Sequence, residues 1–87
     1  MFIKWIAADP TKAYPDFGCS FEMFTNDEFL EVETLGPVTK VLPGQSVELI
    51  ERWGLFRNAN VSELTDEEID RSVIPLVARV AERALAR

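Results

Sequence analysis

Histidine is absent from the chain, and cysteine occurs only once, as Cys19. Without histidine, the usual general base and every Ser–His or Cys–His nucleophile pair are excluded, so acid–base chemistry would fall to carboxylates, lysine or tyrosine. A single cysteine cannot form an internal disulfide, and a zinc site built from cysteine and histidine is excluded as well. We therefore expect the chain to hold no metal and no cofactor.

Basic residues and long apolar runs are also scarce. The chain has 9 basic against 15 acidic residues, for a net charge of −6, and no lysine–arginine cluster that would attract a phosphate backbone. Residues 1–8 are apolar, but they include Lys4 and end at Asp9, so the run is too short for a signal peptide or a membrane span. We expect no nucleic-acid partner, no membrane contact and a cytoplasmic protein.

The remaining composition is that of a small globular protein. Of its 87 residues, 47% are hydrophobic and 28% are charged, which predicts a single domain. A domain of this size buries only about 60–65% of the surface of its unfolded chain, so its stability is small. Within this domain we predict strands over residues 1–57, a linker over 58–64 and a helix over 65–86.

The strand predictions rest on bulky β-branched residues and on alternation of apolar with polar side chains. Turn signals separate the segments, above all at residues 26–28 and at Pro43–Gly44. The predicted strands are residues 1–8, 17–25, 29–35, 38–42 and 46–56.

The helix prediction rests on a start signal and an apolar stripe. Thr65 followed by Glu68 is a capping box, and acidic residues fill the first turn, as the helix dipole favours. The apolar stripe covers about half of the circumference, more than packing on one small sheet requires, which favours a second contact with another chain. Pro75 removes one backbone hydrogen bond and should kink the helix, or else divide it in two.

Together these elements predict an α+β fold, in which four to five short strands form one antiparallel sheet with one C-terminal amphipathic helix. A sheet this small leaves an open face and an unpaired edge, and open edges invite association. We therefore expect a homo-oligomer.

Glu31 and Glu33 are the polar pair that most favours a functional site, because residues two apart in a strand point to the same face. Paired carboxylates serve in acid–base chemistry or bind a hard cation, although no calcium-loop motif is present. The plain alternative is the solvent face of an antiparallel strand. Arg52 is a further candidate, either as a ligand-binding group or as a cross-strand partner of these glutamates.

Two stretches carry a family resemblance. The first is YPDFGCSFEMFTND at residues 14–27, continued by EFLEVETLGP at 28–37; the second is LPGQSV at 42–47, leading to ERWGLF at 51–56. Together they resemble the C-terminal strands of an uncharacterised bacterial family allied to the galactose mutarotases (aldose 1-epimerases). The resemblance covers roughly residues 1–57 and implies the last strands of a large antiparallel β-supersandwich.

The resemblance also implies a site. In mutarotases a glutamate on a late strand acts as general base on the anomeric hydroxyl of the sugar, and Glu33 stands at the matching place. Glu22 and Glu31 would then be polar neighbours in a sugar cleft. The chain departs from the family in having no histidine to act as acid, and a lone carboxylate cannot both remove and deliver the proton.

Two functions follow as hypotheses. The first is a non-catalytic module that binds a carbohydrate or another small ligand, or assembles with itself. The second is a sugar-active, epimerase-like enzyme with a site formed between subunits and Glu33 as base. The absence of histidine favours the first.

Overall fold

The computed structural model describes the backbone of residues 1–85 and the side chains of residues 1–83; residue 86, the predicted end of the helix, lies outside the described residues. The chain divides into two compact units. The terminal unit combines residues 1–6 with the chain from residue 51 onward, and the middle unit comprises residues 7–50.

The terminal unit is built on a two-stranded antiparallel ribbon. β1 (Phe2–Trp5) pairs with β4 (Arg52–Leu55), so that Phe2 lies opposite Leu55 and Trp5 lies opposite Arg52. The Met1 ammonium group extends the ladder by donating to the Phe56 carbonyl at 2.7 Å, while the Phe56 N–H donates to the Met1 carbonyl at 2.8 Å. The first residue of the chain is thereby tied to a residue 55 positions away.

Two helices follow the ribbon in the chain. α2 (Asp66–Ser72) begins at Thr65, whose hydroxyl accepts the Glu68 N–H at 3.2 Å, as the capping signal predicts. α3 (Ile74–Leu85) begins after Val73. Pro75 sits in the first turn of α3, where its missing N–H costs no intrahelical bond. The single kinked helix is therefore wrong, and division in two, the alternative reading of Pro75, is confirmed.

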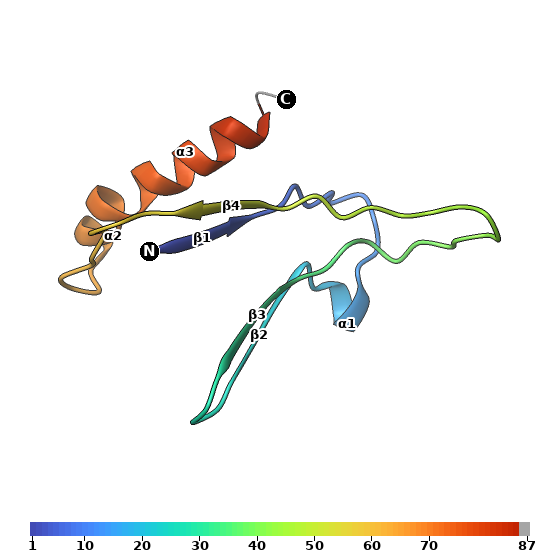
Figure 1. Cartoon of the computed structure of the whole chain (residues 1–87), viewed down its shortest axis with the longest axis horizontal. Coiled ribbons are helices and arrows are strands. Elements are labelled where there is room, and N and C mark those ends of the chain that lie inside the picture. Colours follow the sequence, from blue (N-terminus) through green and yellow to red (C-terminus); the bar gives the residue numbers. More distant parts are fainter. Residues whose placement is uncertain (86–87) are drawn as a thin grey trace. The chain divides into compact units, whose positions relative to one another are not determined.

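Helix α3 lies along the β1–β4 ribbon (Figure 1). The closest approach is at Gly54, where an added Cβ would lie 2.5 Å from Val80 Cγ2 and 2.8 Å from Phe56 Cε2. Val80 is 4% exposed and forms the centre of this small core. The helix can come this close because the strand has no side chain at Gly54.

The middle unit is a turn followed by a β-hairpin. α1 (Pro15–Gly18) is a single turn with left-handed backbone at Asp16 and Phe17 (φ 51° and 63°). β2 (Phe21–Thr25) then pairs antiparallel with β3 (Leu30–Thr34). Asn26 closes the hairpin, because its Oδ1 accepts the N–H groups of residues 28 and 29 at 2.8 and 2.9 Å. The predicted turn at residues 26–28 is thus confirmed.

The α+β class and the C-terminal helix are confirmed, but the single sheet of four to five strands is wrong. Over residues 1–85 there are two sheets of two strands each, β1–β4 and β2–β3. Residues 38–42 form no strand, and only residues 52–55 of the predicted strand 46–56 are extended in a ladder. Alternation identifies a segment that can be a strand, but a strand also needs a neighbouring strand with which to form a ladder, and no second strand pairs with residues 38–42 or 46–51 in the part of the chain that the structure describes.

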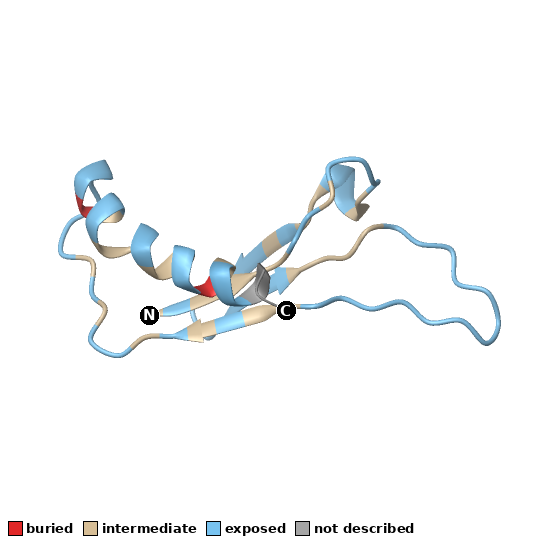
Figure 2. Cartoon of the chain, turned by 90° about the horizontal axis from the view of Figure 1, so that it is seen from above, coloured by how far each residue is buried: buried red, intermediate tan, exposed pale blue. Residues whose placement is uncertain are grey.

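Little of the described chain is buried (Figure 2). Among the side chains of residues 1–83, only Val80 and Glu68 are buried, both on the helices of the terminal unit. Every side chain of the middle unit is half-buried or exposed. As far as the structure describes them, neither α2 nor α3 has the length and apolar character needed to cross a membrane.

Candidate functional site

The β2–β3 hairpin separates acidic from apolar side chains. Its register places Glu22 directly opposite Glu33, and Phe24 opposite Glu31. Directly opposed residues of an antiparallel pair project from the same face, so the three glutamates share one side of the hairpin. We call this side, comprising Glu22, Phe24, Glu31 and Glu33, the acidic face.

Glu22 is the chemically unusual member of the acidic face. A hydrogen bond with the Asp16 carboxyl raises the pKa of Glu22, and partial burial and the negative charges of Asp16 and Glu33 raise it further. The left-handed turn of α1 presents Asp16 to the hairpin. Glu22 therefore retains a proton at higher pH than an ordinary glutamate, and its carboxyl can donate a hydrogen bond.

The structure brings together three of the four side chains that the sequence analysis singled out. Glu22, Glu31 and Glu33 share the acidic face of the middle unit, whereas Arg52 belongs to β4 of the terminal unit. Asp16, which acts on Glu22, was missed by the sequence analysis. It lies just before the region predicted as a strand, and no local pattern announces a left-handed turn at a non-glycine residue.

The opposite side of the hairpin carries no charge. Its side chains alternate with those of the acidic face, and three large ones are well exposed: Phe21 at 49%, Met23 at 60% and Leu30 at 57%. We call this side the apolar hairpin face; its members are Phe21, Met23, Thr25, Leu30, Val32 and Thr34. Contiguous exposed apolar side chains of this kind often mark an interaction surface.

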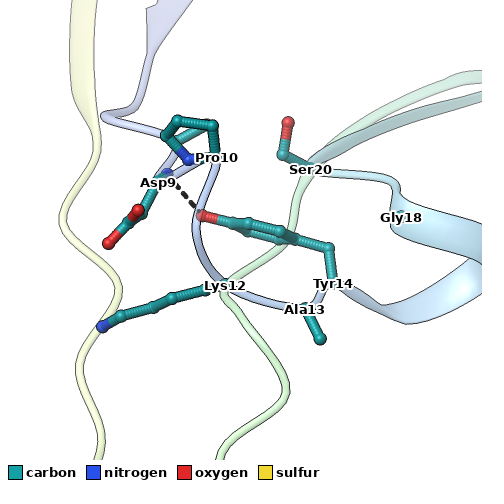
Figure 3. A pocket seen from close by; sticks show the side chains of 8 residues that line it. Asp9, Pro10, Lys12, Ala13, Tyr14, Gly18 and Ser20 are labelled. Carbon is teal, nitrogen blue, oxygen red and sulfur yellow. Dashed lines mark hydrogen bonds between the residues drawn. The ribbon is translucent and has the colours of Figure 1, made fainter.

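A hollow of about 670 Å³ lies beside the turn that precedes the hairpin (Figure 3). The Tyr14 ring lines it, and the Tyr14 hydroxyl accepts the Asp9 N–H at 2.8 Å. The Thr11 hydroxyl and N–H both donate to Asp9 Oδ1, at 2.6 and 2.9 Å, and these bonds lower the pKa of Asp9. Lys12 and Ser20 complete the polar lining. The hollow is wide and open, and its polar groups mainly shape the loop.

Among the residues that the structure describes, no three acidic or sulfur side chains gather closely enough to hold a metal ion. Comparison with protein-family models, with curated proteins and with solved structures finds no match. The resemblance to the mutarotase-like family therefore stays a prediction.

Proposed function

We propose that this chain is a non-catalytic, self-assembling module whose two copies meet through the apolar hairpin face. The observation that carries this proposal is the exposure of Phe21, Met23 and Leu30 side by side on a hairpin with no other layer described against it. An isolated two-stranded hairpin is marginally stable in water. A second apolar layer would stabilise it by removing this surface from water.

Two exposed apolar surfaces could form the contact between copies: the apolar hairpin face and one face of the β1–β4 ribbon. Charge favours the apolar hairpin face. Two chains that each carry −6 repel one another, so their contact needs a surface free of carboxylates. The apolar hairpin face has no charged member, while the ribbon face with Phe2 and Trp53 also carries Lys4, which pairs with Glu51 at 3.3 Å. Two identical apolar sheet faces are also complementary to each other under twofold symmetry.

Met23→Glu tests this proposal, because it places a charge at the centre of the apolar hairpin face. We expect the variant to self-associate about 10- to 100-fold more weakly, since its carboxylate would have to be buried without a partner. Solution mass measured by size exclusion with light scattering, over a wide range of concentration, gives the association constant. Phe24→Glu is the matched control, with the same new charge one residue away on the acidic face and a similar starting exposure of 51%.

A wild-type chain that stays monomeric at every concentration would refute the assembly. Equal weakening by Met23→Glu and Phe24→Glu would place the contact elsewhere on the molecule. Circular dichroism of both variants must match that of the wild type, so that a loss of assembly is not a loss of folding.

A second candidate function is the sugar-active enzyme in which Glu33 is the general base. One observation favours it: Glu22, whose pKa is raised, lies directly opposite Glu33. A carboxyl that keeps its proton to higher pH could deliver a proton while its neighbour removes one, which would supply the acid that a chain without histidine otherwise lacks. The resemblance of residues 14–37 to mutarotase-like strands points in the same direction.

Polarimetry of freshly dissolved aldoses decides between the two candidates. If the enzyme hypothesis is right, the intact protein accelerates anomerisation and Glu33→Gln reduces this acceleration by about 10²–10⁴-fold. Glu28→Gln is the matched control, because it removes the same charge from the hairpin turn outside the acidic face, and it should retain most of the rate. Turnover that survives Glu33→Gln would eliminate Glu33 as the base. If the wild-type protein does not accelerate anomerisation, the enzyme hypothesis is rejected and the non-catalytic module remains as the proposed function.

A further inference from the structure

A second, smaller pocket in the terminal unit gathers positive charge in an acidic protein. It has a volume of about 360 Å³ and lies between β4 and α3. Arg52 from the strand and Arg79 and Arg83 from the helix all line it, together with the aromatic residues Trp53 and Phe56. No acidic side chain lines this pocket. Three of the nine basic residues of a chain with net charge −6 thus converge on one site.

The three positive charges repel one another, and a bound anion would relieve this repulsion. Arg79 and Arg83 are four residues apart on α3, and like charges at this spacing destabilise a helix. Arg52 adds a third positive charge from the facing strand. Among the side chains of residues 1–83, none of the three arginines has an ion-pair partner. The adjacent carboxylate, Glu51, is instead bound to Lys4 Nζ at 3.3 Å and accepts the Trp53 indole N–H at 2.7 Å.

Two of the arginines are held in place without using up their donors. Arg52 is half-buried and donates one N–H to the Glu51 carbonyl at 3.1 Å. The Arg79 guanidinium lies over the Phe56 ring, 5.1 Å from its centroid. Each guanidinium carries five N–H donors, so most of them stay available to a ligand. Holding the groups beforehand lowers the entropy lost when a ligand binds.

We propose that this pocket binds a small anion bearing at least two negative charges, of the phosphate-ester class. Guanidinium groups match the oxygens of a phosphate in paired hydrogen bonds, and three of them balance a dianion or trianion. A volume of about 360 Å³ lies within the range of small-molecule sites and suits a ligand no larger than a sugar phosphate. The inference is independent of the proposed assembly, because the apolar hairpin face belongs to the other unit.

Isothermal titration of inorganic pyrophosphate into the full chain at low ionic strength tests the proposal. We expect saturable binding to one site per chain, weakened about 10- to 100-fold by Arg79→Gln and by Arg83→Gln, because each removes charge-assisted hydrogen bonds. Arg79→Lys should recover only part of the affinity, since a lysine keeps the charge but lacks the paired donors. Arg57→Gln is the matched control: it removes the same group from the same unit, outside the lining of the pocket.

Three outcomes would overturn the proposal. The first is that pyrophosphate gives no saturable heat, and the second is that Arg79→Gln and Arg83→Gln leave the affinity unchanged. The third is that Arg57→Gln weakens binding as much as they do, which would indicate a general attraction to the positive charge of the terminal unit. Binding to vesicles that contain phosphatidic acid, without binding to free pyrophosphate, would also overturn it in favour of a lipid surface. Arg83 is exposed, so its variant tests the pocket without disturbing the core.

Discussion

Gly54→Ala is expected to destabilise the terminal unit by about 1–3 kcal/mol, the usual cost of overpacking a closed contact. The new methyl group would lie 2.5 Å from Val80 Cγ2 and 2.8 Å from the Phe56 ring, closer than atoms can approach. Alanine in place of glycine within a strand would by itself stabilise by about 0.5–1 kcal/mol. The clash exceeds this gain, so Val80 and the Phe56 ring must shift and the contact between α3 and the ribbon must loosen.

Denaturant unfolding followed by tryptophan fluorescence measures this effect selectively, because both tryptophans, Trp5 and Trp53, lie in the β1–β4 ribbon. Gly36→Ala is the control, since a Cβ there would meet only Leu49 Cδ1 at 4.0 Å. Combining Gly54→Ala with Val80→Ala should destabilise less than the sum of the two single changes, because the second makes room for the first. Strict additivity, or an unchanged midpoint in Gly54→Ala, would mean that α3 does not rest on Gly54 in solution.

Glu68→Gln is expected to lower the stability of the terminal unit at neutral pH and to reduce its sensitivity to acid. Glu68 is 7% exposed, and its carboxylate accepts a hydrogen bond from the Ser72 hydroxyl at 2.7 Å and binds the Arg71 guanidinium. The hydrogen bond from Ser72, followed by the hydrogen bond and charge of Arg71, lowers the pKa of Glu68 below its ordinary value near 4.5.

The direction of the pH effect follows from this lowered pKa. The ionised form is favoured by folding, so its stabilisation is present above about pH 4.5 and is lost as the pH falls through the lower pKa of the folded state. Thermal unfolding at pH 7 and at pH 3 should therefore show a wild-type advantage over Glu68→Gln at pH 7 that is smaller at pH 3. Glu67→Gln, an exposed neighbour in the same helical turn, is the control for the helix dipole. An equal difference at both pH values would contradict the prediction.

Local features were predictable wherever a few neighbouring residues supply both the signal and its partner. Thr65 caps α2 because its hydroxyl needs only the Glu68 N–H three residues along. Asn26 closes the hairpin because its side chain reaches the backbone of the next residues. The shared face of Glu31 and Glu33 follows from the period of two in a strand.

Other features depend on residues far apart in the chain. Residues 46–51 alternate as a strand should, yet β4 begins only at Arg52, where β1 supplies a partner. Pro75 allowed either a kink or a break, and the position of the helix start at Ile74 decided for the break. Arg79 and Arg83 lie in the later turns of α3, where the helix dipole favours positive charge, and only the packing of α3 on β4 brings them to Arg52.

The sequence by itself determined the α+β class, the hairpin turn, the helix start and the absence of histidine chemistry, because each depends on composition or on contacts within a few residues. The tertiary structure alone decided the pairing of β1 with β4, the contact of Asp16 with Glu22 and the cluster of three arginines. The second depends on the left-handed turn at Asp16 and Phe17, and the first and the third depend on which distant segments meet. That outcome is set by the total free energy of packing, which no local pattern of residues encodes.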